Sequence, residues 1–146
     1  MTGGTAGEGC VFCRAATEAD PLVVHRGADA FVILNLFPYN NGHVMVVPKR
    51  HIASLVDAAP AELAELMTLV RDAERVLTTA YAPHGINVGL NLGRAAGAGV
   101  ADHLHVHLVP RWNGDTNFMT VVADARVLPE TLDQTAARLR PLFTVP

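Results

Sequence analysis

The sequence has few charged residues and no excess of basic ones. Both shortages limit the classes of function that this protein can have. Only 17% of its 146 residues are charged while 50% are hydrophobic, a balance that argues against intrinsic disorder. Its 11 basic and 14 acidic residues give a formal net charge of -3 without a basic stripe, so we expect no nucleic-acid partner. A small nucleotide is still compatible with this composition, because a few local charges and backbone amides can bind it.

The sequence also lacks long apolar runs and has only two cysteines. No hydrophobic stretch approaches the ~20 residues of a membrane-spanning helix, so we expect no membrane partner. Residues 1–9 lack the basic and apolar blocks of a signal peptide and are rich in glycine and threonine, which predicts a flexible N-terminus. We therefore expect a soluble cytoplasmic protein in which residues 10–146 form one domain.

Hydrophobic periodicity predicts an α+β fold with a mainly antiparallel sheet. A long helix is expected over residues 60–81 and a second helix over residues 129–139, with Asp57 as a candidate cap for the first. The apolar stripe of the long helix consists of Leu63, Leu66, Met67, Val70, Ala73 and Leu77. Short apolar segments predict strands over residues 22–25, 31–35, 43–47, 86–92, 102–111 and 119–123.

Three histidines alternate with aliphatic residues in one of these predicted strands. His103, His105 and His107 recur every second residue, so a strand would direct all three imidazoles to one face. The aliphatic face would pack into the core and leave the imidazole face outside it. Adjacent neutral imidazoles can supply a nucleophile, a metal ligand and a proton relay near pH 7. The alternative is a solvated polar face that happens to use histidine.

Cys10 and Cys13 have the spacing of half a tetrahedral zinc site. The other two ligands would be imidazoles, and the candidates are His51, which follows a predicted strand, and His103, which begins the histidine segment. A redox pair is expected to open a helix that follows a strand, whereas this pair precedes the first predicted strand. Structural zinc, reduced thiols without a metal, and redox chemistry are the three alternatives for this pair.

Residues 93–99 form a predicted loop, rich in glycine and alanine, that leads into the histidine segment. The loop lacks the lysine of a P-loop and the glycine spacing of a dinucleotide fingerprint. Its backbone amides could still cradle a phosphate beside the imidazoles. A plain hairpin turn is the alternative interpretation.

The histidine segment and its surroundings resemble the histidine triad (HIT) family. Residues 103–109 have the family's pattern of three histidines separated by apolar residues, and residues 35–51 resemble the family's upstream strands. The resemblance spans residues 10–118. Within that span, residues 86–93 and 110–118 are similar to the bacterial diadenosine tetraphosphate phosphorylase branch.

This resemblance implies a HIT-like fold and nucleotidyl transfer through a covalent nucleotidyl-histidine. His105 is the middle histidine of the pattern and would be the nucleophile, because neutral imidazole attacks at pH 7 without a separate base. His107 and His43 would fix its tautomer and orient it. The implied substrate is an adenine nucleotide or a dinucleoside polyphosphate whose phosphoanhydride is cleaved, and the implied assembly is a homodimer.

The same resemblance implies ligand contacts and a cofactor. Asn35 falls where the family binds ribose, Asn91 falls where it contacts the α-phosphate or leaving group, and His107 would also touch the substrate. In zinc-bearing members, the ligands of a structural Zn²⁺ match Cys10, Cys13, His51 and His103. These are the four candidates that the ligand count suggests.

One segment departs from the family pattern. Many members have a serine or threonine hydroxyl just before the histidines, whereas residues 97–102 here read Gly-Ala-Gly-Val-Ala-Asp. Phosphate contact would then come from backbone amides near Gly99 and Val100. The alternative functions are a nucleoside phosphoramidate hydrolase of the same family and a non-catalytic nucleotide-binding zinc protein. The alternative role for Asn35 is to cap its turn.

Overall fold

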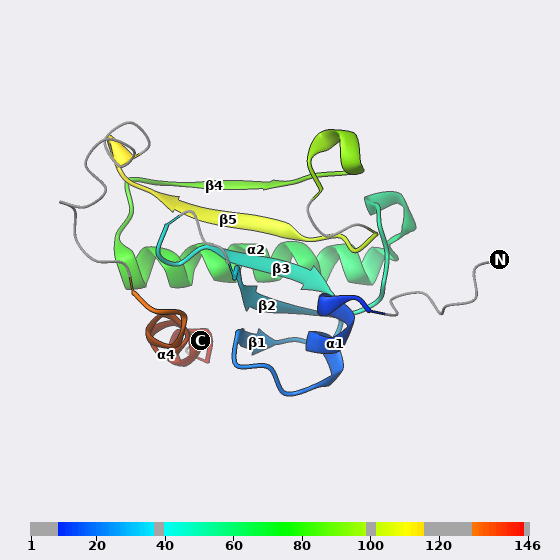
Figure 1. Ribbon diagram of the computed structural model, residues 1–146, viewed down its shortest axis with the longest axis horizontal. Coiled ribbons are helices and arrows are strands. Elements are labelled where there is room, and N and C mark those ends of the chain that lie inside the picture. The colour runs from blue at the N-terminus through cyan, green and yellow to red at the C-terminus, as the bar shows by residue number, and fades with distance from the viewer. Residues whose placement is uncertain (1–8, 37–39, 99–101, 116–129, 145–146) are drawn as a thin grey trace.

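The computed structural model describes residues 9–36, 40–98, 102–115 and 130–144. Five strands form one antiparallel sheet in the order β1-β2-β3-β5-β4 (Figure 1). The strands are β1 (Val23–Arg26), β2 (Ala30–Leu34), β3 (Val44–Pro48), β4 (Gly85–Leu90) and β5 (Val106–Arg111). The helices are α1 (Val11–Thr17), α2 (Pro60–Tyr81) and α4 (Leu132–Phe143), with 3-10 turns η1 (Leu55–Asp57) and η2 (Arg94–Ala96). The predicted α+β fold, with one long helix and a C-terminal helix, is confirmed.

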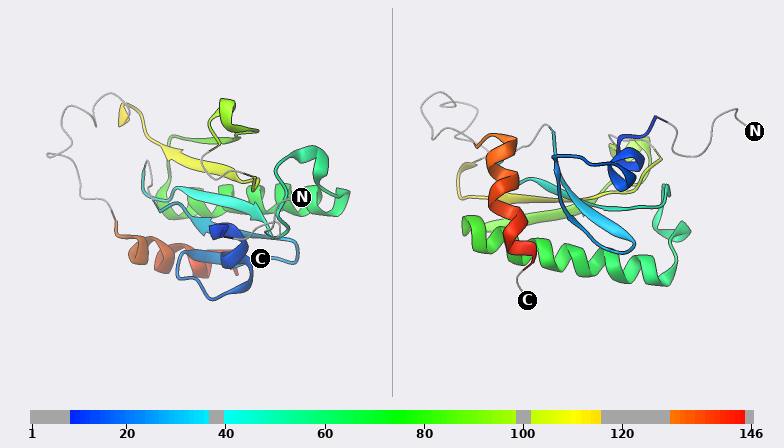
Figure 2. Two further views of the ribbon diagram at one scale, coloured as in Figure 1. Left: turned by 45° about the vertical axis from the view of Figure 1, so that its right-hand side comes forward. Right: turned by 90° about the horizontal axis from the view of Figure 1, so that it is seen from below.

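Helices cover both faces of the sheet. α2 and α4 pack on one face and enclose the larger core, in which Val106 and Leu108 of β5 are buried. α1 lies on the opposite face of the sheet (Figure 2). It covers a smaller apolar cluster that includes Phe12 and Phe31. The aliphatic residues of β5 therefore point to α2, as their alternation predicts.

The histidine segment differs from its prediction in two ways. β5 begins at Val106, so His103 and His105 precede the strand. These two side chains are only 2% and 4% exposed, and the ring of Phe12 contacts both imidazoles. The two imidazoles therefore lie outside the apolar core that buries Val106 and Leu108, as expected, but they are buried because α1 covers them. The sequence-based prediction omits α1 because a seven-residue helix with two buried positions is too short to show a period.

α2 has its predicted bounds, but the predicted apolar stripe is partly wrong. Leu63 and Met67 are 38% and 65% exposed, whereas Leu69 and Val76 are buried. The buried face of a helix is set by the elements that pack on it. Here both the sheet and α4 contact α2, so its buried face is not the stripe chosen from spacing alone.

The helix ends also differ slightly from prediction. Asp57 lies in η1 and does not cap α2; the Glu62 side chain instead accepts a hydrogen bond from the Ala59 backbone N–H. α4 begins at Leu132, after Thr131, whose hydroxyl oxygen accepts from the Gln134 backbone N–H. Such caps satisfy donors that the first helical turn leaves without a partner.

Several predictions fall on residues that the structure does not describe. These are the strand over residues 119–123, the phosphate contacts of Gly99 and Val100, and the flexibility of residues 1–8. Among the described helices, none combines the length and the hydropathy needed to cross a bilayer.

Candidate functional site

A main-chain carbonyl fixes the tautomer of His105. The Nδ1 atom of this imidazole lies 2.9 Å from the carbonyl oxygen of His103. Because a carbonyl oxygen only accepts hydrogen bonds, Nδ1 must carry the proton. The neutral ring therefore has its lone pair on Nε2, the state that a nucleophilic imidazole requires.

Three further polar side chains gather beside His105. The ring of His107 packs edge-on against that of His105, with 4.9 Å between centroids. His107 Nδ1 lies 2.9 Å from His43 Nε2, and the same His43 atom lies 3.3 Å from Asn35 Nδ2. The turn between β2 and β3 makes this approach possible, since the Asn35 N–H donates to the His43 carbonyl at 3.0 Å.

Burial keeps His43 and His107 neutral. It is the main cause that lowers the pKa of His43 from 6.5 to about 4, and the neighbouring His107 lowers it further. Burial, followed by the proximity of His105, also lowers the pKa of His107. At neutral pH both rings therefore act as hydrogen-bonding groups without a positive charge.

The depressed pKa of His43 predicts a loss of stability in acid. Between pH 6.5 and about pH 4 the His43 imidazole is protonated in the unfolded chain but stays neutral in the folded chain. Acidification across this range therefore favours unfolding. We expect His43 to contribute at most about 3 kcal/mol of this loss. Urea unfolding at pH 7 and pH 5 measures it, and His43→Gln should reduce the difference. An undiminished difference in the variant would assign the effect to other groups.

A cavity of about 570 Å³ opens between α1 and the sheet, and His107 forms part of its lining. Most of the lining is apolar and includes Phe12, Ile33 and Met45. Asn35 supplies an amide group to the same cavity. A mostly apolar cavity with a few polar groups is typical of a small-molecule site.

The four predicted metal ligands converge at the N-terminal end of α1. One ligand atom from each of Cys10, Cys13, His51 and His103 lies within 4.8 Å of all the others. The sulfur of Cys13 is 3.2 Å from His51 Nδ1, and the sulfur of Cys10 is 3.3 Å from His103 Nδ1. Residues separated by up to 93 positions thus meet at one point.

The chemistry of these donors fits a metal ion. The Pro48 carbonyl oxygen lies 2.8 Å from His103 Nε2, so Nε2 carries the proton and the lone pair of Nδ1 is directed at the sulfurs. Burial and the adjacent Cys10 raise the pKa of the Cys13 thiol to about 11. A cation would favour the thiolate that burial disfavours, because metals bind sulfur in its deprotonated form. The four residues could therefore hold one four-coordinate ion.

Comparison with known protein families identifies the fold family. A HIT domain profile matches residues 16–114. This chain belongs to the HIT family. It is also 50% identical over 119 residues to a protein named AP-4-A phosphorylase in two strains of Mycobacterium tuberculosis. That match covers 82% of this chain but only 61% of the relative, so the chain spans about three fifths of the relative's length.

Other HIT proteins extend the comparison. This chain is also similar to a protein of Schizosaccharomyces pombe named bis(5'-nucleosyl)-tetraphosphatase (asymmetrical). The two are 37% identical over 93 residues, which are 64% of this chain and 50% of the relative. The crystal structure of a zinc-bound histidine triad family protein from Mycobacterium smegmatis superposes with a TM-score of 0.75 at 27% identity, covering 94% of each chain. The predicted HIT-like fold is thereby confirmed.

Asn91 contacts the glycine loop that precedes the histidine triad. Its Nδ2 donates to the Gly97 carbonyl at 3.1 Å across η2. Gly93 and Gly97 have φ angles of 85° and 95°, which explains glycine at both positions. The Asn91 amide therefore shapes this loop, in addition to the phosphate contact that the family resemblance implies for it.

The sequence reasoning missed Phe12, which lines the cavity and contacts two triad histidines. The position of Phe12 between Cys10 and Cys13 in the sequence could have indicated this role. If both sulfurs of a C-x-x-C segment bind one ion, the side chains between them lie close to that ion. An apolar side chain there has to be covered by the rest of the protein.

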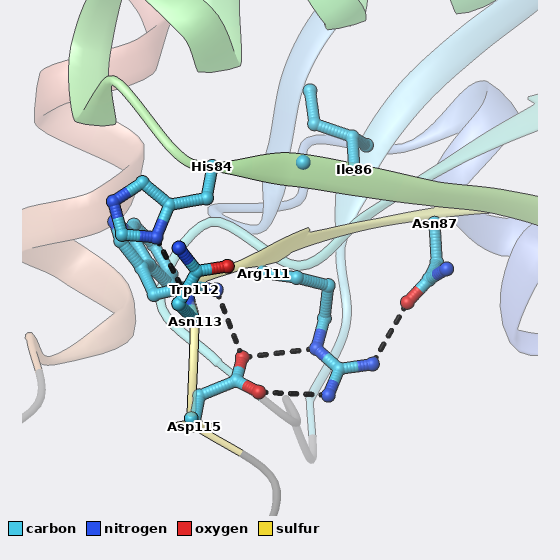
Figure 3. A pocket seen from close by; sticks show the side chains of 9 residues that line it. His84, Ile86, Asn87, Arg111, Trp112, Asn113 and Asp115 are labelled. Carbon is cyan, nitrogen blue, oxygen red and sulfur yellow. Dashed lines mark hydrogen bonds and ion pairs between the residues drawn. The ribbon is translucent and has the colours of Figure 1, made fainter.

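A second cavity, of about 470 Å³, lies where β4 begins and β5 ends (Figure 3). Arg111 is the basic residue of its lining. The guanidinium donates to both Asp115 carboxylate oxygens at 2.9 and 2.8 Å, and to Asn87 Oδ1 at 2.8 Å. Its charge is neutralised within the chain, so we assign no phosphate site to this cavity.

Proposed function

We propose that this chain cleaves a phosphoanhydride bond of a dinucleoside polyphosphate, with diadenosine tetraphosphate as the substrate. The observation that carries the proposal is the hydrogen bond from His105 Nδ1 to the His103 carbonyl. This hydrogen bond leaves the lone pair on Nε2 of His105, and the His105 ring packs against His107, which lines the cavity. The identity to AP-4-A phosphorylase supports this substrate class.

The reaction proceeds in two displacements at one phosphorus atom. His105 Nε2 attacks the α-phosphorus, so a P–N bond forms while the P–O bond to the leaving nucleotide breaks. Phosphate or water then attacks the same phosphorus, the P–N bond breaks, and the proton of the acceptor passes to solvent. Nδ1 keeps its proton throughout, because the His103 carbonyl holds it.

His107 and His43 act as positioning residues, and His107 also contacts the substrate. The hydrogen bond between them fixes the His107 ring against His105. Their low pKa values keep them neutral at pH 7, so neither repels the imidazolium-like nucleotidyl-His105 that forms. Positioning of the reacting atoms supplies most of the rate acceleration.

The metal at the Cys10, Cys13, His51 and His103 cluster is Zn²⁺ in this proposal. Two thiolates and two imidazoles suit zinc better than the hard cations that prefer oxygen ligands. The zinc-bound HIT relative supports this choice. When bound, zinc supplies a structural crosslink between α1, the turn after β3 and the triad segment.

Asn35 binds the ribose of the nucleotide in the cavity. We expect Asn35→Ala to weaken AMP binding by roughly 1–3 kcal/mol, because the sugar hydroxyls lose their partner. The melting temperature should change little. Calorimetric titration and thermal unfolding measure the two quantities. A lower melting temperature with normal affinity would instead assign Asn35 to the structure of its turn.

Phosphates of the substrate lie against the loop between η2 and the triad, held by backbone amides near Gly99 and Val100 and by Asn91. The glycine content of the loop and the hydrogen bond from Asn91 to Gly97 support this assignment. A complex with AMP tests it, because the phosphate oxygens should lie within about 3.2 Å of these amide nitrogens. A phosphate on Lys49 and Arg50 would reject it.

The proposed assembly is a cytoplasmic homodimer. Within the described residues β4 is an edge strand, paired with β5 alone, and its Val88 side chain is 52% exposed. Leu92, just beyond the strand, is 46% exposed. An open edge beside exposed apolar side chains is the kind of surface that a second copy covers. Sedimentation equilibrium measures the mass, and Val88→Lys should shift it toward the monomer.

Product analysis tests the proposed function directly. Incubation with diadenosine tetraphosphate and inorganic phosphate yields ADP plus ATP if phosphate is the acceptor, and AMP plus ATP if water is. Failure to consume this substrate would reject the proposal. Turnover of adenosine phosphoramidate alone would then favour the phosphoramidate hydrolase, and AMP binding without any turnover would favour a non-catalytic nucleotide-binding protein.

A further inference from the structure

α1 is shared between the metal cluster and the cavity. Cys10 is the residue immediately before the helix, and Cys13 lies in its first turn. Val11, Phe12 and Arg14, which are next to these cysteines in the chain, belong to the cavity lining. One short helix therefore presents its sulfurs to the metal cluster and neighbouring side chains to the small-molecule site.

Phe12 is the side chain that connects the two sites. It is 2% exposed, and its ring centroid lies 5.4 Å from that of His103 and 5.1 Å from that of His105. His103 is a candidate metal ligand, and His105 is the proposed nucleophile. The Phe12 ring thus contacts one residue of the metal cluster and one of the proposed catalytic site, and it also forms part of the cavity lining.

The two ends of α1 are held in different ways. At the C-terminal end, the Arg26 guanidinium donates to the carbonyls of Ala15, Ala16 and Glu18 at 2.6, 3.3 and 2.8 Å. At the N-terminal end, the contacts of the two cysteine side chains with His51 and His103 hold the helix to the rest of the fold. A seven-residue helix is too short to be stable by itself, so it depends on both attachments.

We propose that Phe12 couples the metal cluster to nucleotide binding. With the metal bound, the N-terminal turn of α1 is fixed, and Phe12 closes the cavity and packs against His105. Without the metal, the N-terminal turn of α1, which carries Phe12, loosens. Phe12 then no longer closes the cavity or packs against His105. Phe12 is a positioning residue in this scheme, and the inference rests on the proposed nucleotide site.

Linkage makes this coupling measurable without following turnover. If the metal tightens AMP binding by some factor, AMP must tighten metal binding by the same factor. We expect a factor of about ten in the wild-type chain, within the usual range of such couplings. AMP affinity is measured by calorimetry on metal-loaded and metal-depleted protein, and Zn²⁺ affinity by competition with a chromogenic chelator, with and without AMP.

Phe12→Ala should reduce the coupling factor to near one while the metal-loaded variant still binds one Zn²⁺ per chain. Phe12→Leu, which fills much of the same volume without the aromatic ring, should give an intermediate factor. Val23→Ala is the matched control, because Val23 is buried in the same apolar cluster but makes no ring contact with either histidine. This control should keep the wild-type factor.

Three results would overturn the proposal, and the last of them would also reject the nucleotide site. One is a wild-type coupling factor of one, a measurement that does not depend on how any variant folds. Another is an equal coupling factor in Phe12→Ala, Val23→Ala and the wild type. Failure of the proposed function is distinguishable, because a chain that binds AMP but leaves diadenosine tetraphosphate intact still gives a coupling factor. A metal-loaded chain that does not bind AMP rejects the nucleotide site and this inference with it.

Discussion

His105→Asn should lower turnover of diadenosine tetraphosphate by at least about a thousandfold, because the attacking lone pair is removed. Asparagine is a better substitution than alanine at this buried position. His105 is 4% exposed and packs against Phe12, so alanine would leave a void. An asparagine amide can still donate to the His103 carbonyl that now holds Nδ1.

The matched control is His84→Asn, which removes an exposed imidazole immediately before β4. This variant should keep the turnover and the melting temperature of the wild type. Mass spectrometry of the wild type, quenched during turnover at alkaline pH, should detect a nucleotide adduct that His105→Asn lacks. Retention of more than a few per cent of turnover by His105→Asn, with normal metal content, would contradict the covalent mechanism.

The sequence was most informative where a pattern repeats or where chemistry requires a fixed ligand set. Strict alternation around Val106 and Leu108 correctly predicts which side of β5 faces α2. Tetrahedral coordination requires four donors, so two cysteines led to a search for two imidazoles. The structure brings His51 and His103 to those cysteines. Neither deduction depended on knowing how the helices pack.

The sequence was least informative where a contact depends on tertiary packing. α1 is too short to show a hydrophobic period, so its cover over His103 and His105 was not predicted. The hydrogen bond from His105 Nδ1 to the His103 carbonyl arises because these residues precede the regular strand. The choice of the His105 tautomer therefore depends on a local backbone geometry that a simple strand would not produce.

Cys13→Ser should abolish stoichiometric metal binding and lower the melting temperature by at least about 10 °C. The metal would join α1 to the turn after β3 and to the triad segment, so its loss releases all three attachments. Wild-type protein should contain one zinc per chain, with sulfur ligands at about 2.3 Å and nitrogen ligands at about 2.0–2.1 Å in X-ray absorption. Chelation of the wild type should reproduce the lower melting temperature.

Thr17→Ala is the control for this experiment, since Thr17 is exposed on the same helix and its hydroxyl donates to the backbone carbonyls of Cys13 and Arg14 one turn earlier. It should bind zinc normally. The chelator should not destabilise Cys13→Ser further, because that variant has no metal to lose. Metal affinity of the wild type should also fall in acid, because binding requires thiolates and burial raises the pKa of Cys13. A melting temperature that neither chelation nor Cys13→Ser changes would show that α1 is held by its apolar contacts and Arg26 alone.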